Sequence, residues 1–97
     1  MTVQSVEQRN QLKSEIKQKL LIERLGLEDV TEADIADDLP LFGEGLGLDS
    51  VEAFEVMVGL EEMYGLSFEG IPAEDIRRHL QTVESIAALI EAGRANG

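Results

Sequence analysis

Residues 43–52 read Gly-Glu-Gly-Leu-Gly-Leu-Asp-Ser-Val-Glu, a flexible approach that leads into a segment with helical spacing. Three glycines at alternate positions allow backbone angles that other residues avoid. Asp49 is suited to cap a helix that begins at Ser50, and Glu52 three residues later completes a capping box. We therefore expect the Ser50 hydroxyl at the first turn of a helix, facing solvent at the end of a loop, where another protein can modify it.

Apolar residues at helical spacing predict four helices around this stretch. The first begins near Gln11 and ends before Gly26, which is expected to form a left-handed C-terminal cap. The second covers residues 50–64 and is ended by Gly65. The third is short and covers residues 73–80, and Thr82 caps the fourth. The sequence thus predicts an all-α fold, a four-helix bundle of three longer helices and one short helix.

Residues 28–48 connect the first two helices and carry too many apolar side chains for a solvated linker. Proline and glycine prevent a continuous helix here. Burial of each large apolar side chain stabilises a fold by roughly 1.5–3 kcal/mol. We therefore expect a long ordered loop, pinned across the helices, that holds Ser50 in place. Its apolar residues are Val30, Ile35, Leu39, Leu41, Phe42, Leu46 and Leu48.

Length and composition exclude several classes of protein. Ninety-seven residues predict one domain, residues 1–97, with 1–9 and 93–97 expected to be frayed, and leave little room for an enclosed catalytic cavity. The absence of cysteine excludes disulfides and thiolate metal sites. The chain has neither an apolar signal core nor an apolar stretch of membrane-spanning length, so we expect a cytoplasmic protein without stable membrane insertion.

The net charge of −12 is unevenly distributed. Between Leu25 and Ile76 there are 15 of the 20 Asp and Glu residues and no Lys or Arg. Such a field repels nucleic acid and anionic membranes and attracts basic protein surfaces. The alternative interpretation is that the acidity only keeps a small protein in solution.

The second predicted helix has two apolar faces. One follows core spacing and comprises Val56, Met57, Leu60, Met63 and Tyr64. The other lies beside Ser50, comprises Val51, Phe54 and Val58, and is surrounded by Glu52, Glu55, Glu61 and Glu62. An apolar seam flanked by carboxylates is typical of a docking surface. The alternative is that Phe54 is buried in the bundle.

Gly59 is unusual within this helix, because a mid-helix glycine costs about 1 kcal/mol relative to alanine. Close helix packing would explain it.

Most catalytic and metal-binding motifs are absent. Ser50 lacks the Gly-x-Ser-x-Gly context of a hydrolase, and the one histidine, His79, lies in a different predicted helix. No lysine follows the loop glycines as in a P-loop, and the acidic loops do not fit a calcium-binding hand. We therefore predict no catalytic residue, no metal site and no enzymatic activity.

The segment Gly47-Leu48-Asp49-Ser50-Val51, followed by an acidic helix, resembles the attachment site of acyl carrier proteins. The resemblance extends from about Leu12 to Ile90. It implies that Ser50, beside Asp49, receives covalent 4'-phosphopantetheine from coenzyme A through a phosphopantetheinyl transferase. The thiol of this arm would hold acyl groups as thioesters for fatty acid, specialised lipid or polyketide biosynthetic enzymes.

The same resemblance implies which surfaces meet partners. Synthases and acyl-loading enzymes would present basic docking grooves to the second helix of a monomeric carrier, at Val51, Glu52, Phe54, Glu55, Val58 and Glu62. An acyl chain would slip between the helices near Val56, Met57, Leu60 and the last helix.

The chain departs from the family pattern at several positions. Val51 replaces the usual leucine, Phe54 is bulkier than usual, and Arg77 and Arg78 interrupt the acidity of a long segment from Leu66 to Gln81. These departures favour a specialised carrier over a housekeeping one. An aminoacyl or D-alanyl carrier with the same arm, and an unmodified acidic helical interaction module in which Ser50 is only part of a cap, are the alternatives.

Overall fold

The computed structural model describes the backbone of residues 2–96 and the side chains of residues 7–93. This part of the chain is all-α, with no strand, which confirms the predicted class. None of its helices is long and apolar enough to cross a lipid bilayer. The elements are α1 (Thr2–Glu15), the π-helical segment η1 (Ile16–Glu23), the 3-10 turn η2 (Glu32–Asp34), α2 (Ser50–Tyr64), α3 (Ala73–His79) and α4 (Val83–Asn96).

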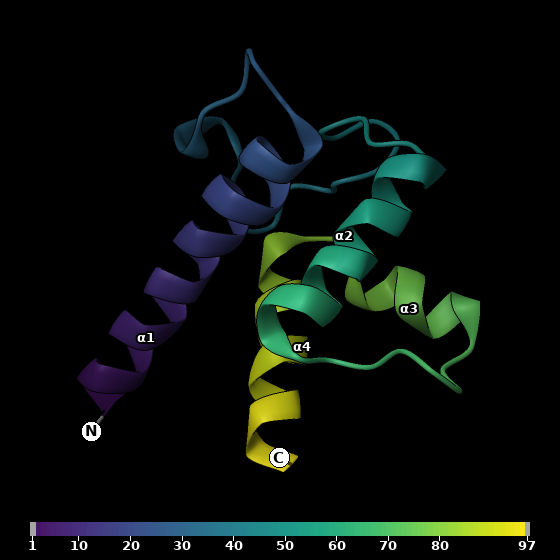
Figure 1. Ribbon diagram of the computed structural model, residues 1–97. Coiled ribbons are helices and arrows are strands. Elements are labelled where there is room, and N and C mark those ends of the chain that lie inside the picture. The colour runs from purple at the N-terminus through teal and green to yellow at the C-terminus, as the bar shows by residue number, and fades with distance from the viewer. Residues whose placement is uncertain (1, 97) are drawn as a thin grey trace.

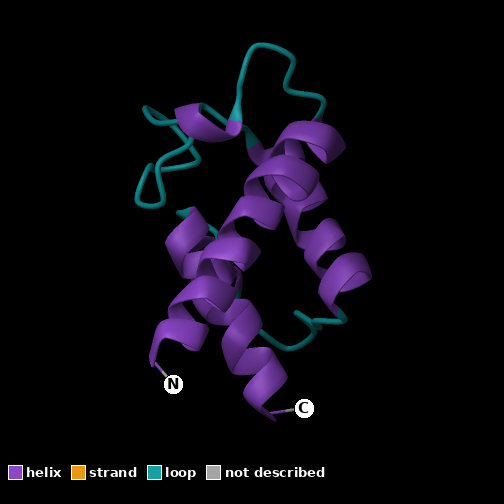
Figure 2. Cartoon of the chain, turned by 90° about the vertical axis from the view of Figure 1, so that its left-hand side faces the viewer, coloured by secondary structure: helices purple, strands orange, loops and turns teal. Residues whose placement is uncertain are grey.

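The three longer helices and the short α3 form a bundle (Figure 1). α1 packs on α4, while η1 packs on both α2 and α4. Both ends of the chain lie at one end of the bundle, and the long loop before α2 lies at the opposite end (Figures 1 and 2). Ser50, the first residue of α2, is therefore at the loop end of the bundle, away from the termini.

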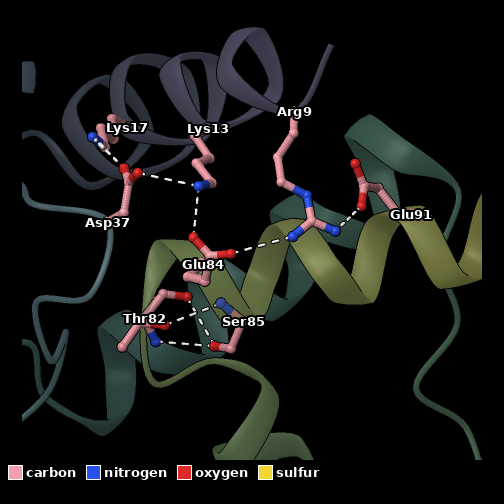
Figure 3. A network of polar contacts seen from close by, with 8 residues as sticks. All are labelled: Arg9, Lys13, Lys17, Asp37, Thr82, Glu84, Ser85 and Glu91. Carbon is pink, nitrogen blue, oxygen red and sulfur yellow. Dashed lines mark hydrogen bonds and ion pairs between the residues drawn. The ribbon is translucent and has the colours of Figure 1, made fainter. Parts of the chain in front are cut away.

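The first helix begins earlier than the sequence predicts. We expected fraying up to residue 9 and a helix from Gln11, but α1 begins at Thr2. The Arg9 guanidinium contacts the carboxylates of Glu84, at 3.2 Å, and Glu91 on α4 (Figure 3). These ion pairs tie the middle of α1 to a helix distant in the sequence. Met1 lies outside the described residues.

Halfway along, this helix widens into η1. The apolar residues Leu12, Ile16, Leu20 and Leu21, and Leu25 recur every four or five positions, a wider interval than the 3.6 residues of an α-helical turn. The wider i→i+5 winding of a π-helix keeps such residues on one side. Ile16, Leu20 and Leu21 are indeed fully buried.

The predicted left-handed cap at the end of this helix is confirmed. Gly26 has a φ of 69°, and the Leu27 N–H donates to the Ile22 carbonyl at 2.9 Å. This is the longer hydrogen bond of the Schellman motif.

The long loop is pinned across the bundle, as expected. Ile35 and Leu41 are fully buried, and Leu48 is 5% exposed. The Leu41 N–H donates to the Gln81 carbonyl at 2.8 Å, which attaches the middle of the loop to the segment before α4. The loop that leads to Ser50 is thus fixed to the bundle.

One apolar core unites the loop with the helices. No polar or charged residue is fully buried in the described part of the chain. The buried residues are Leu12, Ile16, Leu20, Leu21, Ile35, Leu41, Leu48, Val56, Leu60, Phe68, Leu80, Val83, Ile86, Ala87 and Ile90.

The ends of the later helices follow their predicted caps. Gly65 ends α2 with a φ of 67°. Before α4, the Ser85 N–H donates to the Thr82 hydroxyl at 3.0 Å, and the Thr82 N–H donates to the Ser85 hydroxyl at 3.1 Å (Figure 3). α4 continues to Asn96, although fraying was expected from residue 93; Gly97 lies outside the described residues.

Ion pairs join α1, η1, the loop and α4 (Figure 3). The Lys13 ammonium lies 3.1 Å from the Asp37 carboxylate and 2.6 Å from that of Glu84, while Lys17 lies 2.8 Å from Asp37. Hydrogen bonds from Lys17 and Lys13 hold the pKa of Asp37 below its ordinary value, and the hydrogen bond to Glu84 raises the pKa of Lys13. The Glu84 N–H also donates to the Asp37 carbonyl at 2.9 Å.

Candidate functional site

The predicted capping box forms at the start of α2. The Glu52 N–H donates to Asp49 Oδ1 at 2.9 Å, and the Asp49 N–H donates to Glu52 Oε1 at 3.0 Å. Just before it, buried Leu48 anchors the end of the loop. Ser50 therefore lies two residues after the buried Leu48. It begins a helix whose first turn is held by the two hydrogen bonds of the capping box.

The Ser50 side chain is exposed and uncommitted. Among residues 7–93, its hydroxyl has no hydrogen-bond partner. The N-terminus of a helix presents free N–H groups and the positive end of the helix dipole, both of which favour a phosphate group. A phosphate ester on Ser50 Oγ would thus lie in solvent and close to a favourable field.

Two of the three apolar residues predicted beside Ser50 are strongly exposed. Val51 is 71% exposed and Phe54 is 58% exposed, so the alternative of a buried Phe54 is wrong. Val58 is half-buried. We call Val51, Phe54 and Val58 the apolar seam of α2.

The opposite face of α2 packs into the core as predicted, with one exception. Val56 and Leu60 are fully buried, and Met57 and Tyr64 are half-buried. Met63, on the last turn, is 37% exposed, so its predicted place in the core is wrong. Full burial along this face ends at Leu60, one turn earlier.

The carboxylates around the apolar seam differ in what they already bind. Glu52 is engaged by the capping box. Glu55 and Glu62 both contact the guanidinium of Arg24, with Nε 3.5 Å from the Glu55 carboxylate and Nη2 2.9 Å from that of Glu62. Glu61 accepts from the Phe68 N–H at 3.5 Å.

Our interpretation of the sequence did not include Arg24 in this site. The signal that points to it is Gly59, which follows Glu55 by four residues and precedes Glu62 by three, on the same face of α2. A Cβ atom at Gly59 would lie 2.4 Å from Leu20 Cδ1 and 2.9 Å from Arg24 Cδ. The expectation of close helix packing at Gly59 is confirmed.

A pocket of about 310 Å³ lies between the α2–α3 connection and α4, lined by Leu66, Phe68, Ile71 and Leu89 among others. It begins at Gly65, the far end of α2, about 22 Å along the helix from Ser50. It is therefore separate from the Ser50 site. Nearer to Ser50, Val56 and Leu60 are fully buried, so an acyl chain between the helices there has to displace packed side chains.

A model of the family described as "Phosphopantetheine attachment site" matches residues 11–90 of the chain. The match begins in α1 and ends in α4. It thus covers most of the chain and contains Ser50 with the apolar seam.

Proposed function

We infer the function from the premise that this chain belongs to the phosphopantetheine attachment site family, whose members carry covalently attached 4'-phosphopantetheine. The chain is a phosphopantetheine carrier. We propose that Ser50 is the attachment residue and that the carried groups are acyl groups, held as thioesters for fatty acid, specialised lipid or polyketide biosynthetic enzymes.

The observation that carries the proposal for Ser50 is its exposed hydroxyl at the N-terminus of α2, inside the matched region. In the loading step, Ser50 Oγ forms a bond to the pantetheine-side phosphorus of coenzyme A, and adenosine 3',5'-bisphosphate leaves. The hydroxyl proton passes to the transferase. The arm supplies a thiol, which this cysteine-free chain lacks.

The chain's own residues hold and present the attachment point. Leu48 fixes the loop, and Asp49 with Glu52 fixes the first turn of α2. The apolar seam supplies contact area to the transferase and to acyl-loading and synthase enzymes. The surrounding carboxylates, Glu55 and Glu62 among them, speed the encounter with basic grooves, since charge complementarity mainly raises association rates.

The test of attachment is the intact mass of the protein after incubation with coenzyme A, Mg²⁺ and a broad-specificity phosphopantetheinyl transferase. We expect the mass of one phosphopantetheine on the wild type and none on Ser50→Ala, which keeps its helicity because Asp49 still caps α2. Ser67→Ala, a change at an exposed serine in the connection after α2, is the matched control and should load normally. Loading of Ser50→Ala, or no loading of the wild type, would refute the assignment.

The identity of the carried group is tested separately. Mass spectrometry of the protein purified from its native host should show acyl groups on the arm. Aminoacyl groups would support the D-alanyl or aminoacyl alternative, and a bare Ser50 in the host would support the unmodified interaction module.

A further inference from the structure

Arg24 packs against α2 at Gly59 and contacts two carboxylates of the proposed docking face. Glu55 and Glu62 are seven residues apart, so they lie two turns apart on one side of α2. The guanidinium of Arg24, from the end of the first helix, lies between them, 3.5 Å from the Glu55 carboxylate and 2.9 Å from that of Glu62. The Arg24 side chain is only 25% exposed.

Gly59 lets the Arg24 side chain pack this closely against α2. It lies between Glu55 and Glu62 on the same side of the helix, and a Cβ there would come within 2.9 Å of Arg24 Cδ and 3.1 Å of Arg24 Nε. The Arg24 side chain therefore occupies a notch that only glycine leaves open.

The guanidinium is held but incompletely satisfied. Its Nε atom is buried and has no hydrogen-bond partner among the described residues, although it is close enough to Glu55 for an ion pair. Both carboxylate partners are substantially exposed to solvent, with side-chain exposures of 46% for Glu55 and 63% for Glu62. Ion pairs this exposed contribute little to stability, so a competing cation can replace Arg24.

The other side of the seam is different. Glu61 follows Val58 by three residues and Glu62 follows it by four, so the two carboxylates lie on opposite sides of Val58. Glu61 is exposed and has no ion pair with a residue in the described ranges. The flank of Glu55 and Glu62 is thus neutralised by Arg24 of the same chain. The flank of Glu61 has no such cation in the described ranges.

We propose that Arg24 is a specificity-determining residue for docking, because it occupies the Glu55–Glu62 flank and competes with basic groups of the partner enzyme. This rests on the proposed function, in which basic partners dock on α2. A partner that places its cations against Glu61 docks without disturbing Arg24. A partner that needs Glu55 or Glu62 must first displace the guanidinium.

The first test compares Arg24→Gln with Arg78→Gln in loading by a phosphopantetheinyl transferase at low ionic strength. Both changes remove one positive charge, but Arg78 is 75% exposed on α3, and Asp75, its one ion-pair partner among the described residues, lies as far as 3.9 Å away. We expect Arg24→Gln to raise kcat/KM about two- to fivefold through a lower KM, with a steeper salt dependence, and Arg78→Gln to change it less. Equal effects, or a lower kcat/KM for Arg24→Gln, would overturn the proposal. Arg24→Met, which keeps the stem against Gly59, replaces Arg24→Gln if that variant unfolds.

The second test changes single carboxylates in the presence and in the absence of Arg24. With Arg24 present, Glu61→Gln should lower kcat/KM more than Glu62→Gln, because Glu62 is already paired. In the Arg24→Gln background, the loss caused by Glu62→Gln should grow. A Glu62→Gln effect that is the same in both backgrounds contradicts competition by Arg24.

A third measurement separates this inference from the proposed function. Hexalysine is titrated into the unloaded protein at low ionic strength, and the amide signals of Val58 and Glu62 are followed by NMR. We expect tighter binding to Arg24→Gln than to Arg78→Gln at these signals. If the wild type is not loaded, the assignment of Ser50 as the attachment residue is refuted. The NMR comparison of the two arginine variants still decides the role of Arg24. Equal binding would overturn that role even in a fully loaded carrier.

Discussion

At the scale of single residues, Gly59 shows a conflict between helix propensity and packing. Alanine would favour the helix by about 1 kcal/mol, yet the site has no room for its methyl group. The atom it would meet first, Leu20 Cδ1 at 2.4 Å, belongs to a fully buried side chain. Packing of η1 against α2 therefore decides the residue at this position.

Gly59→Ala should destabilise the protein. Overpacking a tight site costs about 1–3 kcal/mol, which exceeds the propensity gain of about 1 kcal/mol. We expect a net loss of up to about 2 kcal/mol in the free energy of unfolding, measured by urea denaturation. Ala88→Gly, at an exposed position of α4, calibrates the propensity difference in this protein. A more stable Gly59→Ala would show that the close contact is not what requires glycine.

At the scale of elements, α2 depends on a capping box that also positions the attachment residue. Asp49 accepts from the Glu52 N–H, and Glu52 accepts from the Asp49 N–H. These bonds satisfy two groups at the helix start that otherwise have no partner inside the helix. The order of the first turn, which includes Ser50, therefore depends on both hydrogen bonds of the capping box.

Asp49→Ala should lower the free energy of unfolding by about 0.5–2 kcal/mol, because the side-chain acceptor of the N-cap is lost. Asp49→Asn should be close to wild type, since asparagine caps as well as aspartate. Thermal unfolding followed by circular dichroism gives both values. If the two variants unfold alike, the carboxylate charge rather than the cap hydrogen bond stabilises this turn.

The elements that the sequence predicted correctly are those set by neighbouring residues. The caps at Gly26, Asp49, Gly65 and Thr82 depend on local hydrogen bonds and backbone angles, and each is found where it was expected. The exposed seam at Val51 and Phe54 is one of the two interpretations that helical spacing allowed, the other being a buried Phe54.

The features that the sequence did not predict depend on contacts between distant segments. The early start of α1 coincides with ion pairs from Arg9 to α4 residues more than 70 positions away. Arg24 meets Glu55 and Glu62 only because η1 packs on α2. Periodicity within one helix contains no information about such pairs, although the unexplained Gly59 marked the place where they meet.

At the scale of the whole molecule, a chain of charge −12 concentrates its few cations where segments join. Lys13 and Lys17 connect the first helix to Asp37 of the loop, and Lys13 also reaches Glu84 of α4. The loop that carries Ser50 is thus attached to the bundle by charge as well as by its apolar side chains.

The ion pairs of Asp37 with Lys13 and Lys17 make the stability of the fold depend on pH in the acid range. Hydrogen bonds from Lys17 and Lys13 hold the pKa of Asp37 below its ordinary value of 3.8. The folded state therefore holds this proton less tightly than the unfolded chain, so the pairs stabilise the fold above the unfolded pKa. That stabilisation is lost as the pH falls through the folded pKa.

Asp37→Asn should consequently lower the free energy of unfolding near neutral pH by up to about 1 kcal/mol, as for other exposed ion pairs. The difference from the wild type should shrink as the pH is lowered below about 4, because the wild type then loses the same charge. Urea unfolding at a series of pH values measures it. Asp38→Asn, at an exposed neighbour with no ion pair to a residue in the described ranges, should show no such convergence. If the wild type is no more stable than Asp37→Asn near neutral pH, the Asp37 backbone contact to Glu84, rather than its charge, attaches the loop.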